Sequence, residues 1–183
     1  MALQSALELF WERGYEATTM ADLVEHIGVA KASIYATFGS KRELYMKALD
    51  RYAELVDPGL LRGLSQPGST LPAVRQLIEQ YVGDATGETR QRGCFVVNTA
   101  VELAAHDPLA ARRVQASWDH LETALTSALV RAQAQGELAE AKDPRALARF
   151  LLVLMQGLRV VGKAATDPGR ARDAATQALA VLD

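Results

Sequence analysis

The apolar positions of the chain recur with the spacing of an α-helix along most of its length. Near the N-terminus four of them share one helical face: Leu3, Ala6, Leu7 and Phe10. Gly14 follows, where a left-handed residue commonly ends a helix. No alternation of apolar and polar residues bounded by turns is found, so strands are not expected. The pattern predicts an all-α protein.

Two capping boxes define the helices that follow. Thr19 with Asp22 and Ser40 with Glu43 each pair a hydroxyl with a carboxylate three residues later, as at helix starts. Gly28 between them provides a tight turn. The predicted N-terminal helices cover residues 3–13, 20–27, 31–38 and 40–55.

The rest of the chain is predicted to form a connection followed by five longer helices. Residues 57–69 contain two prolines and three glycines and are predicted to be irregular. Three Asp-Pro pairs are expected to start helices, with Asp as N-cap and Pro in the first turn: 107–108, 143–144 and 167–168. The predicted helices cover residues 71–84, 94–105, 109–135, 145–165 and 170–182.

Aromatic residues divide the chain into two parts. Seven of the eleven lie in the first 52 positions, which suits a small helical domain that needs bulky rings to fill its interior. We therefore predict an N-terminal domain over residues 1–47 and a larger helical domain over residues 48–183.

Composition narrows the functional classes. The longest apolar run, residues 150–155, is far shorter than the roughly 20 residues that a membrane span needs. No basic stretch precedes an apolar one at the N-terminus, so a secretory signal is not expected. The single cysteine, Cys94, excludes an internal disulfide and a cysteine-rich zinc module. These features predict a cytoplasmic protein without a membrane partner.

The net charge of −2 argues mildly against non-specific binding to nucleic acid. Its distribution weakens that argument. Residues 26–42 hold three basic residues, Lys31, Lys41 and Arg42, and no acidic one. An acid-free window of this kind can face phosphate even when the whole chain is weakly acidic.

The two short helices on either side of Gly28 are expected to cross through five apolar residues: Leu23, Val24, Ile27, Val29 and Ile34. The second helix then presents a small, polar and cationic surface formed by Lys31, Ala32, Ser33, Tyr35 and Thr37. Such a helix fits a DNA major groove, which is about 12 Å wide.

Here the sequence resembles the TetR/AcrR family of bacterial regulators. The resemblance covers roughly the first fifty residues. It rests on Phe10, Gly14, Tyr15, Thr18, Thr19, Gly28, Val29, Lys31, Ser33, Ile34, Tyr35, Phe38, Ser40, Lys41, Leu44 and Tyr45. It implies a helix-turn-helix DNA-binding domain followed by a ligand-binding and dimerisation domain. It also implies a homodimer that binds a palindromic operator, by default a repressor, with an unknown small-molecule effector.

The resemblance assigns roles to individual residues. Thr19 would contact phosphate through its hydroxyl or backbone N–H, and Tyr35 and Lys41 would also contact phosphate. Lys31 and Ser33 would reach bases or nearby phosphates.

Three features depart from the family pattern. Ala21 stands where arginine is frequent, and Ala32 stands where glycine is frequent. No basic arm precedes the first helix. We expect fewer phosphate contacts, and therefore weaker and less salt-dependent DNA binding than in a family member with the arm.

The helix over residues 145–165 is apolar nearly all round, which indicates burial on more than one side. The last helix has four small residues that permit close helix approach: Ala171, Ala174, Ala175 and Ala178. We predict a four-helix dimer interface built from these two helices of each subunit. A monomeric bundle core is the alternative.

A ligand pocket is predicted in the larger domain. Its candidate residues are Phe95, Asn98, Glu102, Trp118, Phe150, Met155, Leu158 and Arg159. The helical face that carries Cys94, Asn98, Glu102 and His106 fits exposure to water equally well. Cys94 is either an electrophile sensor or an inert buried thiol. Glu102 and His106 lack a third ligand, so no metal or other cofactor is expected.

An enzyme is the first competing functional class. The three histidines form no recognisable catalytic group, and no phosphate loop or nucleophile motif occurs, so an enzyme is not expected. A helical small-molecule carrier or adaptor that has lost DNA binding is the remaining alternative. The negative net charge and Ala21 favour it, whereas four residues oppose it: Lys31, Ser33, Tyr35 and Lys41.

Overall fold

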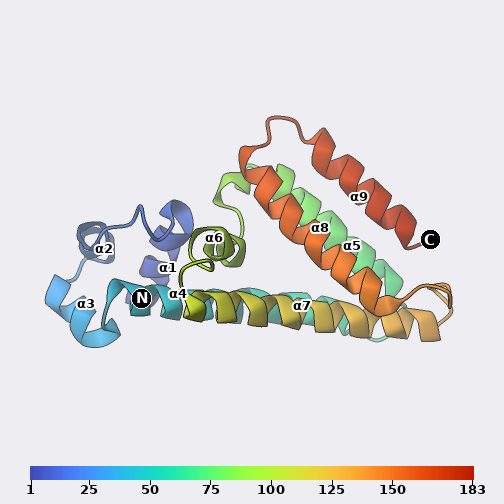
Figure 1. The fold of residues 1–183 in the computed structure, drawn as a ribbon, viewed down its shortest axis with the longest axis horizontal. Coiled ribbons are helices and arrows are strands. Elements are labelled where there is room, and N and C mark those ends of the chain that lie inside the picture. Colours follow the sequence, from blue (N-terminus) through green and yellow to red (C-terminus); the bar gives the residue numbers. More distant parts are fainter. The chain divides into compact units, whose positions relative to one another are not determined.

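The computed structural model is built from helices (Figure 1). It describes the backbone of residues 1–183 and the side chains of all of them except residues 57, 60 and 61. The helices are α1 (Ala2–Arg13), α2 (Met20–Ile27), α3 (Lys31–Phe38), α4 (Lys41–Leu64), α5 (Leu71–Thr86), the 3-10 turn η1 (Arg90–Arg92), α6 (Phe95–Glu102), α7 (Pro108–Ala134), α8 (Pro144–Ala164) and α9 (Gly169–Val181). The described backbone contains no strand, which confirms the all-α prediction.

The chain forms two compact units. The first contains residues 1–56 and 94–115, and the second contains residues 57–93 and 116–183. The first unit therefore combines the N-terminal helices with α6 and the start of α7. The sequence predicts a domain boundary after residue 47. The two units are defined by contacts within the chain and not as domains, so that boundary stays a prediction.

The first unit is built on an aromatic core. Phe10, Tyr45 and Phe95 are completely buried. The Tyr45 ring meets those of Phe10 and Phe95 edge-on, with ring centroids 4.9 and 5.0 Å apart. Such pairs contribute about 0.5–1.5 kcal/mol each beyond the area they bury. The predicted small aromatic core is thus present, and Phe95 of α6 completes it.

The start of α4 agrees with the sequence prediction, but its end does not. The helix was expected to stop near Leu55, whereas it continues through Pro58 and Gly63 to Leu64. Proline removes one helical hydrogen bond, but its backbone φ of about −65° is compatible with a helix. Leu64 is buried in the core of the second unit, which anchors the helix end there. Tertiary packing thus overrides the local helix-breaking signals.

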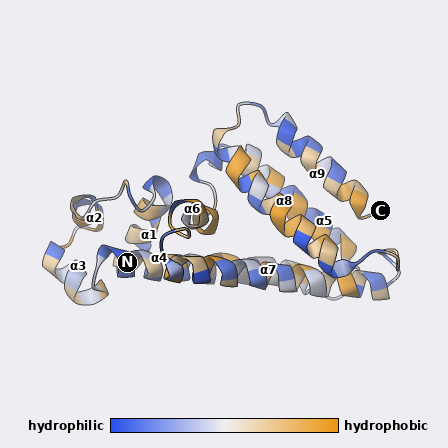
Figure 2. Ribbon diagram, viewed as in Figure 1, coloured by the Kyte–Doolittle hydropathy of each residue, from blue (hydrophilic) through white to orange (hydrophobic). Residues whose placement is uncertain are grey.

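The second unit is a bundle in which α5, α8 and α9 run side by side (Figure 1). Hydrophobic residues extend along α5 and α8 (Figure 2). Gly162 of α8 lies so close to α5 that an added Cβ would be 2.6 Å from the Ala85 carbonyl oxygen.

The small residues of α9 pack within their own chain. Ala171, Ala175 and Ala178 are buried there against the same unit. Close approach to α5 and α8 therefore accounts for their small size, and the dimer interface expected from the last two helices stays a prediction.

Two of the three Asp-Pro pairs start helices as predicted. Asp107 accepts hydrogen bonds from the N–H groups of Leu109 and Ala110, and Asp143 caps α8 in the same way. The third prediction was wrong in detail. Pro168 itself is the N-cap of α9, and the Asp167 carboxylate accepts from the Gly169 N–H.

Candidate DNA-binding surface

Helices α2 and α3 are set by local signals in the sequence. Thr19 and Asp22 form the predicted capping box, in which the Thr19 hydroxyl accepts from the Asp22 N–H. Gly28 ends α2 with φ 75°, a conformation that strains any residue with a Cβ. Leu23 of α2 and Ile34 of α3 are buried and anchor the two helices within the first unit.

Helix α3 exposes nearly its whole surface. Ile34 is its buried residue, and Tyr35 remains 44% exposed. The predicted contact residues of this helix are all exposed, and so is Ala36, which the sequence prediction left out: Lys31, Ala32, Ser33, Tyr35, Ala36 and Thr37. The helical period would have indicated Ala36, because it lies one turn after Ala32 on the same face of the helix. The Lys31 ammonium lies 5.8 Å from the centre of the Tyr35 ring, so these two side chains share one edge of the helix.

Thr19 differs from its predicted role. Its backbone N–H donates to the Asp22 carboxylate at 2.7 Å, and its hydroxyl is 2.5 Å from the same oxygen. The hydrogen bonds from Thr19 lower the pKa of the Asp22 carboxyl below its usual value, so the group is an anion at neutral pH. Both donors proposed for phosphate are engaged, and a phosphate contact would require Thr19 to exchange Asp22 for DNA.

Lys41, the first residue of α4, is held by an aromatic face. Its ammonium lies 4.1 Å from the centre of the Tyr15 ring, within the range of a cation–π interaction. Ser40 and Glu43 form the second predicted capping box around it, through the Ser40 N–H and the Glu43 N–H. Tyr15 therefore limits where the Lys41 charge is placed.

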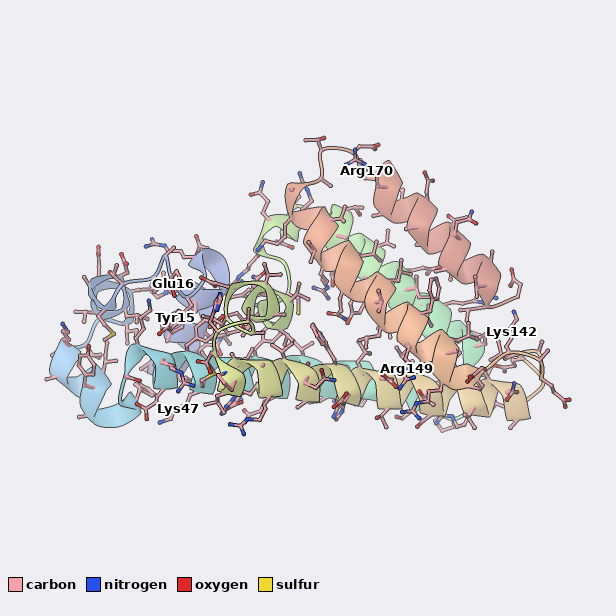
Figure 3. All side chains as sticks on the ribbon, viewed as in Figure 1. Tyr15, Glu16, Lys47, Lys142, Arg149 and Arg170 are labelled. Carbon is pink, nitrogen blue, oxygen red and sulfur yellow. The ribbon has the colours of Figure 1, made fainter. Side chains whose placement is uncertain are left out.

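Glu102 of α6 binds the loop between α1 and α2, where Tyr15 and Glu16 lie (Figure 3). Its carboxylate accepts the Tyr15 N–H at 2.9 Å and the Glu16 N–H at 2.8 Å. A Cβ added to Gly14 would be 3.0 Å from the same carboxylate, so the glycine allows the close approach. Glu102 was predicted to line a ligand pocket. Its acceptor oxygens instead hold the loop that leads into α2.

Two bidentate ion pairs join the start of α7 to α4. The Arg42 guanidinium donates to both oxygens of Asp107, and Arg113 donates to both oxygens of Asp50 at 2.6 and 2.8 Å. The hydrogen bond from Arg42 holds the pKa of the Asp107 carboxyl well below its usual value. The same carboxylate caps α7, so one side chain both starts α7 and fastens it to α4.

The predicted ligand-pocket residues divide between the two units. Phe95 is buried in the aromatic core of the first unit, and half-buried Asn98 belongs to the same unit. Met155 and Leu158 are buried in the second unit, and the buried Trp118 Nε1 has no hydrogen-bond acceptor among the described residues.

Two other pocket candidates, Arg159 and Phe150, lie on α8. Arg159 pairs with Asp84 at 2.7 Å and lies 4.6 Å from the centre of the Tyr81 ring. Phe150 is 43% exposed on α8. Whether these residues bind a ligand stays a prediction.

An exposed apolar stripe runs along α8. Val153 is 71% exposed, and Phe150, Val160 and Val161 are each more than 40% exposed. With Gly157 and Ala164, also exposed, the stripe repeats every three or four residues: Phe150, Val153, Gly157, Val160 and Ala164. The opposite face of α8 fills the core of the second unit.

The described side chains include no group of three histidine, cysteine or acidic residues placed to hold a metal ion. No helix among the described residues has the length and hydropathy of a membrane span. Cys94 is half-buried, and the Tyr52 hydroxyl lies 3.5 Å from its sulfur.

Comparison with known proteins decides the family. Residues 2–48 match the family model described as "Bacterial regulatory proteins, tetR family", and residues 70–179 match "Tetracyclin repressor-like, C-terminal domain". The chain belongs to the TetR family of transcriptional regulators. The family assignment from the N-terminal residues is thereby confirmed, and the match now extends over the C-terminal helices.

Relatives of this TetR-family chain support the assignment along its whole length. It is 36% identical to the uncharacterized HTH-type transcriptional regulator YezE of Bacillus subtilis (strain 168), over 100% of this chain and 95% of YezE. It is 31% identical to the HTH-type transcriptional repressor ComR of Escherichia coli (strain K12), over 87% of this chain and 76% of ComR.

Solved structures share the fold. A cysteine mutant of the TetR family regulator CifR, complexed with 26 bp operator DNA, superposes with a TM-score of 0.86 at 28% identity, over 100% of this chain and 95% of CifR. A TetR regulator from Chloroflexus aurantiacus also gives a TM-score of 0.86, at 25% identity, over 98% of this chain and 90% of that protein.

Proposed function

We propose that this TetR-family regulator is a ligand-responsive repressor that binds a palindromic operator as a homodimer, with α3 in the major groove. The exposed, acid-free outer surface of α3 carries the proposal, since a helix with this surface suits base edges and phosphates. The structural neighbour CifR bound to operator DNA supports it. The proposed DNA-contacting residues are Lys31, Ala32, Ser33, Tyr35, Thr37 and Lys41.

The contacts divide by chemistry. Lys41 supplies charge at the start of α4, and the Tyr35 hydroxyl supplies a hydrogen bond, so both suit phosphate oxygens. Lys31 is an exposed cation in the first turn of α3, the part of a recognition helix that reaches base edges. Contacts to phosphate position the protein, and contacts to bases select the sequence.

The dimer rests on the exposed stripe of α8. A run of apolar residues at alternating spacings of three and four is the seam along which two helices pack. A second copy of the same chain covers it by two-fold symmetry, since the same stripe occurs on both subunits. Val181 of α9 is 42% exposed and extends the apolar surface to the last helix. A symmetric dimer presents two α3 helices to half-sites about 34–36 Å apart.

The effector pocket of this proposal lies in the second unit. The buried Nε1 of half-buried Trp118, which has no acceptor among the described residues, supports it, because a buried N–H group is normally paired. An effector that favours one arrangement of the two units would change operator affinity, and DNA would change effector affinity by the same factor. Replacing Trp118 by Phe should weaken the response to an effector while leaving operator affinity without the effector unchanged.

Selection of bound duplexes from a random pool tests DNA recognition. Wild type is compared with Lys31→Ala and Tyr35→Phe, and with Lys142→Ala, which removes a lysine charge from the second unit. We expect a palindrome that wild type and Lys142→Ala enrich equally and that the two α3 variants bind more weakly. A folded, dimeric protein that enriches no duplex at low salt would contradict the proposal and favour the carrier or adaptor function. Placing the selected site over a reporter promoter then separates repression from activation.

A further inference from the structure

The centre of the exposed face of α3 carries two methyl groups. Successive residues of an α-helix are turned by about 100°, so the positions opposite buried Ile34 are Ala32 and Ala36, one turn apart. Both alanines are exposed. We call Ala32 and Ala36 the outer row of α3.

Polar groups lie at the two edges of the outer row. Lys31 and Tyr35 share one edge, where the ammonium lies 5.8 Å from the ring centre. The helical period places Ser33 and Thr37 at the other edge. When the centre of this face meets the floor of a groove, the alanine methyl groups arrive first and the polar side chains flank them.

The composition of α3 restricts what the outer row can recognise. The helix contains no arginine, asparagine, glutamine, aspartate or glutamate. Together with lysine, which α3 carries at its edge as Lys31, those are the side chains that bind guanine or adenine through two hydrogen bonds or accept the amino group of cytosine, and the outer row itself holds none of them. A methyl group forms no hydrogen bond with a base edge. The base-edge group that favours an apolar contact in the major groove is the 5-methyl group of thymine.

Building on the function proposed above, we propose that Ala32 and Ala36 read thymine 5-methyl groups in each operator half-site. Their small side chains bring the α3 backbone close to the groove floor, and each buries one base methyl group. The specificity of this regulator therefore depends on methyl–methyl contacts at the outer row, with hydrogen bonds at its edges.

Deoxyuridine substitution tests this directly, because uracil differs from thymine only in lacking the 5-methyl group. The selected palindrome is synthesised in a series of versions. In each version, deoxyuridine replaces two symmetry-related thymidines, one in each half-site. The affinity of wild type for each version is measured at one salt concentration. Burial of one methyl group is worth about fourfold in affinity, so a replaced pair should weaken binding by roughly fifteenfold. We expect one or two sensitive thymine positions in each half-site, and tolerance of uracil elsewhere.

Matched variants assign the sensitive positions to residues. Ala32→Gly and Ala36→Gly remove the protein methyl group, so each should bring the thymine-to-uracil affinity ratio close to one at its own position. Ala21→Gly makes the same change on α2 and should leave every ratio unchanged.

The outcomes separate this inference from the function it rests on. If no duplex is enriched, DNA recognition itself has failed, and the inference fails with it. If a palindrome is enriched but uracil is tolerated at every position, the protein binds DNA and the inference alone is wrong. Sensitivity to uracil that persists in full in both glycine variants also overturns it.

Discussion

Replacing Glu102 by alanine removes the acceptor of two backbone N–H groups in the loop between α1 and α2. The Tyr15 N–H is partly buried, and the Glu16 N–H is exposed. In the variant, water can replace the carboxylate at Glu16 but reaches Tyr15 less easily. The loop that leads into the capping box of α2 therefore loses its attachment to α6.

The expected cost follows from the number and setting of these bonds. A hydrogen bond to a charged group contributes about 1.5–3 kcal/mol, and partial exposure favours the low end of that range. The bond from the Tyr15 N–H should contribute most of one such free energy, and the exposed bond from the Glu16 N–H a smaller part. The Glu102→Ala variant should therefore lower the free energy of unfolding of the first unit by about 2 kcal/mol, and Glu102→Gln, which keeps one acceptor oxygen, by about 1 kcal/mol.

Amide hydrogen exchange and urea denaturation measure this loss at fixed protein concentration. Exchange at the Tyr15 and Glu16 amides should accelerate in Glu102→Ala, because their opening no longer breaks a hydrogen bond. The control is Glu12→Ala, which removes an exposed glutamate of α1 and should change neither quantity. If Glu102→Ala and Glu12→Ala unfold within about 0.5 kcal/mol of each other, the usual range for neutral surface substitutions, the reasoning is refuted.

Four further predictions follow from individual contacts. Gly28→Ala should lower the free energy of unfolding by about 1–2 kcal/mol, because its φ of 75° opposes a Cβ, and a urea-denaturation loss below about 0.5 kcal/mol would contradict this. Val153→Glu should convert dimers to monomers in sedimentation velocity, because it charges the exposed stripe of α8; an unchanged dimer would exclude that stripe as the interface. Tyr15→Leu should weaken operator binding by about two- to fivefold in anisotropy titrations, and Tyr15→Phe should not, because the ring face and not the hydroxyl holds Lys41; equal effects would rule out this positioning role. Arg42 holds the pKa of the Asp107 carboxyl below its ordinary 3.8, so the stability it contributes is present above that value and is lost as the pH falls. The difference in unfolding free energy between wild type and Asp107→Asn should therefore be constant between about pH 5 and 7 and shrink below about pH 4, and a difference that persists undiminished at pH 2 would argue against the ion pair.

The N-terminal helices could be predicted from the sequence because their signals are local. The Thr19–Asp22 box and Gly28 each act within one turn of the helix end they define. The bounds of α2 and α3 consequently agree with the prediction to the residue. The capping signal at Asp107 was also visible, because the acceptor and its donors lie within three residues of each other.

Features that depend on distant parts of the chain were missed. Glu102 and the loop it binds are 87 and 86 positions apart, and nothing local marks the partner. The end of α4 was placed too early because Leu64 is held by core residues far along the sequence. Three alanines of α9 pack within their own chain, a contact that the sequence could not specify because a small side chain permits close approach without identifying the neighbouring helix.

The most direct test of operator recognition by paired α3 helices compares the selected palindrome with a duplex in which one half-site is scrambled. Fluorescence anisotropy titration with wild type and Lys31→Ala gives both affinity and stoichiometry. We predict saturation at two chains per palindrome, much weaker binding to the single half-site, and weaker binding by Lys31→Ala to both. Equal affinity for the palindrome and the scrambled duplex, unaffected by Lys31→Ala, would contradict the account.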